Sequence, residues 1–133
     1  MSDLFKKLNL KDQTRILVLD APASFEPELA GLAGVSVDRA VAGGPVTFAL
    51  AFVQTQAGLD ACSRELADRA EGDALLWFAY PKQSSRNFTC EFNRDTGWEV
   101  LRSAGWDSVR IVAIDADWSA LRFRRNAFVK PRA

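Results

Sequence analysis

The chain has 133 residues, of which 48% are hydrophobic and 26% charged, which is the size and composition of one globular domain with a buried core. Seventeen basic residues balance seventeen acidic ones, so we expect neither nucleic acid nor an acidic membrane surface as a partner. The sequence contains no histidine, which excludes Ser-His-Asp and Cys-His catalysis and removes the commonest metal ligand. We therefore expect no metal site and assign no catalytic residue.

The sequence also bears on where the protein works. No apolar run reaches the roughly 18 residues that a membrane-spanning helix needs, and the N-terminus has no apolar signal core. A cytoplasmic protein without a membrane partner is the expectation. The two cysteines, Cys62 and Cys90, lack metal-type spacing, so in a reducing compartment we expect them to be buried free thiols.

The first third of the chain alternates short apolar segments with turns. Residues 2–8 predict a short helix with an apolar stripe. Residues 15–19 (RILVL) follow as a strand buried on both faces, because their apolar character is continuous rather than alternating. A short helix at 28–32, entered by a proline, leads to a weaker strand at 35–37.

The middle of the chain carries the strongest signals. Residues 46–53 (VTFALAFV) predict a second buried strand, and residues 56–70 show the spacing of an amphipathic helix. Residues 74–80 form the next apolar run, and Pro81 ends it because proline donates no ladder hydrogen bond. We expect this strand at the centre of the sheet.

The last third predicts one helix and a hairpin. Asn93 or Asp95 is positioned to cap a helix that ends at Gly105. Strands are expected at 109–114 and 119–124, and the alternation of the second places it near an edge or in a hairpin. From about residue 125 the tail is expected to fray.

Together these elements predict an α/β fold in a single domain spanning residues 1–133. Strands separated by helices form a parallel sheet covered on both faces, hence a three-layer Rossmann-like sandwich. We expect a mainly parallel sheet of about five or six strands, in an order near 2-1-3-4, with a C-terminal antiparallel hairpin.

The first candidate site follows the fourth strand. Lys82 and Arg86 bracket Ser84 and Ser85 in a loop at the carboxyl edge of the sheet, where ligands of such folds bind. Two cations and two hydroxyls suit a phosphate, sulfate or carboxylate. No glycine-rich phosphate loop accompanies them, so a solvated loop with turn-capping hydroxyls is the competing interpretation.

Two weaker candidates use aspartates. Asp20 and Asp38 follow the first two strands, as acidic residues do in methyltransferase-like and dinucleotide-binding folds, where the second acid accepts hydrogen bonds from ribose hydroxyls. The glycines of such a site are missing, which favours turn-capping aspartates. Asp115 and Trp118 flank the hairpin turn, where a carboxylate caps the turn and the ring covers the sheet or stacks on a ligand.

Several motifs together resemble an uncharacterised family of small bacterial proteins, a domain of unknown function. They are the Trp77–Lys82 strand end with its two serines, the Asn93-Arg94-Asp95 helix start and the Trp-Ser-x-Leu-Arg-Phe pattern ending at Phe123. The resemblance implies no activity. It implies that a shared set of residues, Asp95 among them, belongs with the rim: Lys82, Arg94, Asp95, Asp115, Trp118, Ser119 and Arg122.

The leading expectation is a bacterial cytoplasmic protein, non-catalytic, whose rim after the fourth strand binds a small anion or a protein partner. No cofactor is predicted. One alternative is a degenerate methyltransferase-like or nucleotide-binding enzyme that uses Asp20 and Asp38. Another is a protein–protein interaction module that works through Trp118 and the basic tail.

Overall fold

A computed structural model gives the fold and describes residues 3–41 and 44–129. Six strands form one sheet in the order β2-β1-β3-β4-β6-β5. Their bounds are β1 (Arg15–Leu19), β2 (Ser36–Asp38), β3 (Val46–Phe52), β4 (Ala70–Pro81), β5 (Trp106–Ala113) and β6 (Trp118–Arg125). The predicted α/β class and strand order are confirmed.

The sheet is parallel from β2 through β4 and antiparallel beyond it. The last strand, β6, lies between β4 and β5, so the hairpin partner β5 forms the edge of the sheet. Alternation along β6 therefore does not mark an edge. It separates Leu121 and Phe123, which are buried, from the half-buried arginines at 122 and 124.

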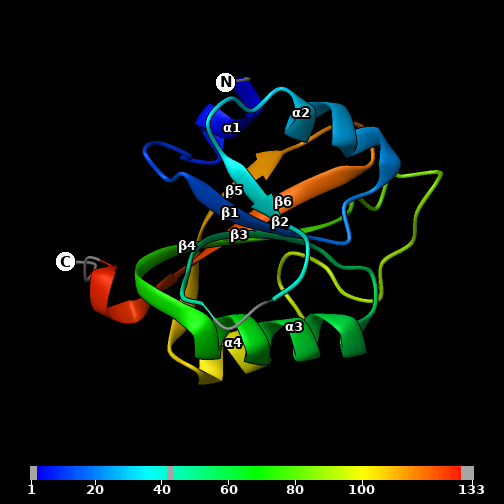
Figure 1. The fold of residues 1–133 in the computed structure, drawn as a ribbon. Coiled ribbons are helices and arrows are strands. Elements are labelled where there is room, and N and C mark those ends of the chain that lie inside the picture. Colours follow the sequence, from blue (N-terminus) through cyan, green and yellow to red (C-terminus); the bar gives the residue numbers. More distant parts are fainter. Residues whose placement is uncertain (1–2, 42–43, 130–133) are drawn as a thin grey trace.

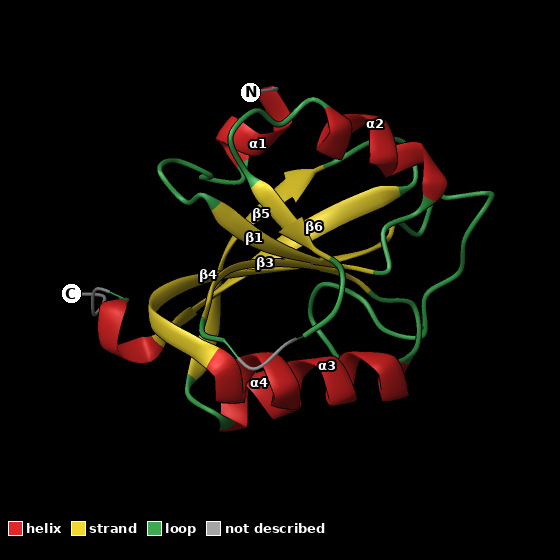
Figure 2. Ribbon diagram, viewed as in Figure 1, coloured by secondary structure: helices red, strands yellow, loops and turns green. Residues whose placement is uncertain are grey.

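Helices cover both faces of the sheet, which gives three layers (Figures 1 and 2). One face carries α1 and α2, and the other carries α3 and α4. Two short 3-10 helices, η1 and η2, follow β1 and β6. The bounds are α1 (Asp3–Lys7), η1 (Ala23–Phe25), α2 (Glu26–Ala30), α3 (Gln56–Arg69), α4 (Glu99–Ser103) and η2 (Asn126–Phe128).

The predicted start of α4, at Asn93 or Asp95, is wrong, because this helix begins at Glu99. The Asn93 side chain instead accepts hydrogen bonds from the backbone N–H groups of Asp95 (2.8 Å) and Thr96 (3.0 Å), so it caps a turn. Gly97 then takes φ 101°, a left-handed conformation that interrupts any helix. Only the five residues of α4 are helical in this segment.

Two apolar clusters, one on each face, share β4 as their common wall. Leu76, Phe78 and Tyr80 face α3, whereas Leu75 and Trp77 face α1. Trp77 is fully buried, and its Nε1 donates to the carbonyl oxygen of Leu8 at 2.9 Å, which ties the loop after α1 to the sheet. The prediction that the 74–80 segment is the buried centre of the sheet is confirmed.

The ends of the chain are only partly described. Within the tail expected to fray from about residue 125, residues 126–128 form η2, and residues 130–133 lie outside the described residues. Within residues 3–41 and 44–129, no helix combines the length and apolar character needed to cross a bilayer.

Candidate functional site: a cleft at the carboxyl end of β4

A cleft of about 860 Å³ opens where β4 ends. Its floor is the strand end, where Tyr80 pairs across the strands with Ser119 of β6. The loops at 82–89 and 90–96 supply its walls. The polar lining residues are Tyr80, Lys82, Gln83, Ser84, Ser85, Thr89, Cys90, Glu91, Asn93, Arg94, Asp95, Thr96 and Ser119.

Four of the five residues that the sequence assigned to the rim line this cleft: Lys82, Ser84, Ser85 and Asp95. Lys82 is half-buried, whereas Ser84 and Asp95 are exposed. Arg86 is exposed and does not line the cleft. One wall therefore carries a cation and hydroxyls, and the opposite wall carries a carboxylate.

The loop after β4 is held in place by the hairpin turn. The Lys82 backbone N–H donates to the Asp117 carbonyl oxygen at 2.7 Å, and the Ser85 hydroxyl donates to the Asp117 carboxylate at 2.8 Å. The amide of Asn87 donates to the same carboxylate at 3.2 Å. The Ser85 oxygen also accepts from the Phe88 backbone N–H at 3.1 Å, so this hydroxyl shapes the loop rather than facing a ligand.

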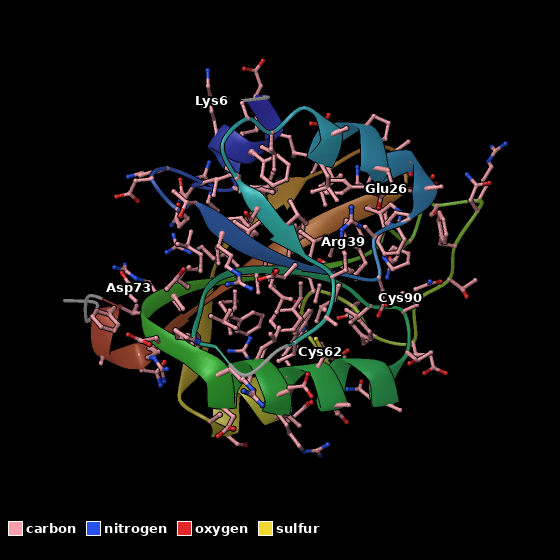
Figure 3. The ribbon with its side chains drawn as sticks, in the orientation of Figure 1. Lys6, Glu26, Arg39, Cys62, Asp73 and Cys90 are labelled. Atoms are coloured by element: carbon pink, nitrogen blue, oxygen red, sulfur yellow. The ribbon has the colours of Figure 1, made fainter. Side chains whose placement is uncertain are left out.

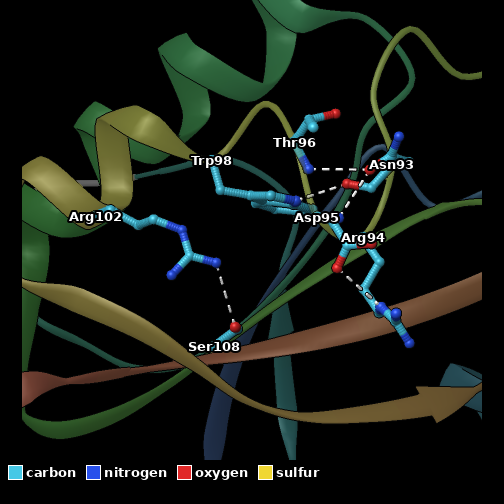
Figure 4. A network of polar contacts seen from close by, with 7 residues as sticks. All are labelled: Asn93, Arg94, Asp95, Thr96, Trp98, Arg102 and Ser108. Atoms are coloured by element: carbon cyan, nitrogen blue, oxygen red, sulfur yellow. Dashed lines mark hydrogen bonds and ion pairs between the residues drawn. The ribbon is translucent and has the colours of Figure 1, made fainter.

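The second wall is a tight turn closed by a tryptophan (Figure 4). The Asn93 side chain accepts two hydrogen bonds from backbone N–H groups, as described above. In addition, the backbone carbonyl oxygen of Asn93 accepts from Nε1 of Trp98 at 2.8 Å. Arg94 and Asp95 project from this turn and pair at 3.3 Å while remaining 63% and 74% exposed. An exposed pair of this kind contributes little stability, so both side chains are available to a ligand.

Two titratable groups of the cleft, Tyr80 on the floor and Cys90 in a wall, are protonated at neutral pH. Burial raises the pKa of the Tyr80 hydroxyl, and nearby Arg94 opposes the shift in part. Burial also raises the pKa of the Cys90 thiol. Both groups can therefore donate hydrogen bonds, and neither is an activated nucleophile.

The crevice between β1 and β3, at the reversal of strand order, is built differently. Arg15 donates to both carboxylate oxygens of Asp38, through Nε at 2.5 Å and Nη2 at 3.2 Å. Asp38 is the last residue of β2 but pairs in register with Leu17, two residues before β1 ends, and its carboxylate is engaged by Arg15. Asp20 is exposed and takes φ 56°, the left-handed turn conformation that a glycine would adopt at less cost.

An aromatic ring packs at the carboxyl end of β3. Phe25, in η1 after β1, is 2% exposed and its ring lies 5.0 Å from that of Phe52, the last residue of β3. The first connection therefore packs onto the carboxyl end of β3 instead of cradling a ligand.

The hairpin turn has a structural role. Asp115 accepts from the backbone N–H groups of Asp117 at 2.8 Å and Trp118 at 2.9 Å. Trp118 is 2% exposed and packs between Phe52 and Phe88, at 5.1 and 4.9 Å. Its ring therefore covers the sheet end and has no free face for a partner.

The two cysteines lie on the α3 side of the sheet (Figure 3). Both are free thiols, and burial raises the pKa of Cys62 to about 12. Within residues 3–41 and 44–129, no group of three or more Cys, Asp or Glu side chains is arranged to hold a metal ion.

Several cleft residues carry little sequence signal. Tyr80 and Ser119 are far apart in the chain and meet only through the β4–β6 register. Alternation along residues 119–124 put Ser119 on one face, but not opposite Tyr80. Thr96 and Cys90 lie in loops without periodicity.

No protein-family model matches the sequence, and no curated protein matches it significantly. Solved structures do resemble it. The fold is that of SAM-dependent methyltransferases. One from Aquifex aeolicus is 16% identical with a TM-score of 0.63, covering 91% of this chain and 87% of its own.

Two further structures have the same architecture. Magnesium protoporphyrin IX methyltransferase from Synechocystis PCC 6803, with bound SAH, is 10% identical with a TM-score of 0.59 over 92% of this chain and 78% of its own. A LepI variant, in complex with SAH and a substrate analogue, is 10% identical with a TM-score of 0.55 over 92% of this chain. The chain spans 39% of the length of LepI.

These neighbours correct the leading expectation. A non-catalytic domain defined by an anion- or partner-binding rim is wrong as the first interpretation, and the alternative of a degenerate methyltransferase-like protein is favoured. The crevice residues do not fit the methyl donor itself. Phe25 packs on Phe52 at the carboxyl end of β3, Asp38 is held by Arg15, and the connection lacks the glycines that let backbone approach a cofactor.

Proposed function

We propose that this chain is a degenerate methyltransferase-like protein that binds a nucleotide-type ligand in the cleft at the end of β4. The observation that carries the proposal is the composition of that cleft. Lys82 and Arg94 can contact an anionic group, Asp95 can accept from ribose hydroxyls, and the half-exposed ring of Phe88 can stack on a base.

The shape and chemistry of the cleft agree with such a ligand. Its volume of about 860 Å³ lies in the range of small-molecule sites. The protonated Tyr80 and the Ser119 hydroxyl offer donors on the floor, where a phosphate or base oxygen would lie. The neighbouring solved structures contain SAH, an adenosine-bearing ligand, which supports testing this class first.

Isothermal titration calorimetry with AMP, SAM and SAH tests the proposal on the full chain. We expect AMP to bind, and we expect SAM to bind more weakly because it carries no phosphate for Lys82 and Arg94 to contact. Lys82→Ala and Phe88→Ala should each weaken AMP binding about tenfold, the cost of one charge-assisted contact or one stacked base.

Arg86→Ala is the matched control, because this exposed arginine neighbours the cleft without lining it. Its AMP affinity should equal that of the wild type. Absence of AMP binding by the wild type, or equal affinity in the Lys82→Ala variant, would contradict the proposal. A cytoplasmic location stays a prediction and is tested by cell fractionation.

A further inference from the structure

The β5–β6 hairpin carries three arginines on one face of the sheet. Arg122 and Arg124 alternate with the buried Leu121 and Phe123 along β6, and Arg110 of β5 pairs in register with Arg122. Further along the same face, apolar Val112 pairs with Ala120, and both are buried. The face thus changes from apolar to cationic towards the amino end of β4.

One of the three charges is neutralised within the protein. Arg124 donates to both carboxylate oxygens of Asp73, through Nε at 2.8 Å and Nη2 at 2.6 Å. Asp73 lies on β4, directly beside β6. Both oxygens of the Asp73 carboxylate are therefore engaged by Arg124.

The other two side chains are not paired with an anion among the described residues. Neither the Arg110 guanidinium nor the Arg122 guanidinium forms a hydrogen bond or ion pair with any residue in 3–41 or 44–129. The Nε of Arg122 is buried and unsatisfied, although an orphaned charged donor carries a desolvation cost. Like charges directly opposite each other on neighbouring strands are also destabilising.

We infer that Arg110 and Arg122 form a phosphate-binding site on this sheet face, independent of the β4 cleft. Two uncompensated guanidinium groups match the two charges of a phosphate dianion, whereas a single carboxylate would leave one charge over. A phosphate held between the two guanidinium groups would remove the cross-strand repulsion. Burial and the neighbouring Arg124 and Arg110 lower the pKa of Arg122, with Asp73 opposing them, which agrees with a cation that lacks an anion.

Inorganic phosphate, titrated at constant ionic strength against the full ¹⁵N-labelled chain, is the probe. We expect a saturable shift of the Arg122 Nε–H signal, which is assigned by its loss in Arg122→Gln. Arg110→Gln should weaken phosphate binding about tenfold, because it removes one charge-assisted contact. Arg110 is exposed, so this variant leaves the core intact even if Arg122→Gln fails to fold.

Two variants separate this site from the others. Arg102→Gln, an exposed arginine paired with Asp107, should leave phosphate affinity unchanged. Lys82→Ala should also leave it unchanged while impairing the β4 cleft. The inference is overturned if the Arg122 signal does not shift, if Arg110→Gln binds as the wild type does, or if Lys82→Ala abolishes the shift.

Discussion

The ring of Phe25 lies 5.0 Å from the ring of Phe52, at an interplanar angle of 59°. This contact belongs to a continuous series of aromatic rings. Phe5 lies 6.0 Å from Phe25 on one side, and Trp118 lies 5.1 Å from Phe52 on the other. Since Trp118 contacts Phe88 of the cleft, the Phe25 ring is linked through Phe52 and Trp118 to the wall of the β4 cleft.

Phe25→Ala should lower the free energy of unfolding by about 3–5 kcal/mol, because it removes a buried ring and leaves a cavity. Urea unfolding followed by tryptophan fluorescence measures the change. Phe128→Ala is the control, since its ring is 42% exposed and its loss should cost less than about 0.5 kcal/mol. Similar losses in both variants would contradict the role given to Phe25.

A second prediction compares two buried tryptophans. Trp77→Phe should lower the free energy of unfolding by about 1–3 kcal/mol more than the change in packing does, because it leaves the Leu8 carbonyl oxygen without its donor. Trp118→Phe removes an N–H that has no partner among the described residues, so it lacks this penalty. Chemical denaturation of both variants should therefore find Trp77→Phe the less stable, and the reverse order would refute the assignment.

The sequence predicts the sheet well because a buried strand shows as an apolar run in the sequence. The continuous apolar runs of β1, β3 and β4 follow from their helix-covered positions between neighbouring strands, and such runs need no knowledge of distant partners. The order of the strands follows from the short connections and their handedness. The interior position of β6 is harder to predict, because alternation also occurs in an interior antiparallel strand with one charged face.

The site was only partly predictable, because its residues meet through tertiary contacts. An asparagine such as Asn93 caps a helix or a turn with the same hydrogen bonds, and the positive φ of Gly97 decides between them. The pairing of Asp38 with Arg15 depends on the β1–β2 register. Nothing in the local pattern indicated that Phe25 would lie on Phe52.

A third prediction concerns the Asp117 carboxylate, which holds the loop after β4. Asp117→Ala removes the acceptor of Ser85 and Asn87, so backbone amides at 85–88 should exchange with deuterium about tenfold faster. Binding in the cleft should weaken in parallel. Asp107→Ala, whose carboxylate pairs with Arg102 on another part of the surface, should leave that exchange unchanged. Equal protection in Asp117→Ala and wild type would exclude this role.

The Cys62 thiol makes stability depend on pH in the alkaline range. Burial, with smaller contributions from Glu65 and Asp20, raises its pKa from 9.0 to about 12. Above pH 9 the unfolded chain loses this proton while the folded chain keeps it, so the contribution is complete below pH 9 and is lost progressively up to about pH 12. One pH unit in this window corresponds to about 1.4 kcal/mol.

Cys62→Ala should therefore flatten the fall in stability between pH 9 and about pH 10.5, as urea unfolding at several pH values would record. Tyr80 and Cys90 also have raised pKa values and act in the same direction, but they remain in both proteins and cancel in the comparison. Because the thiolate is the reactive form, Cys62 should also react with Ellman's reagent at about pH 8 only after unfolding. Identical alkaline slopes in wild type and Cys62→Ala, or rapid labelling of folded Cys62, would contradict a buried, protonated thiol.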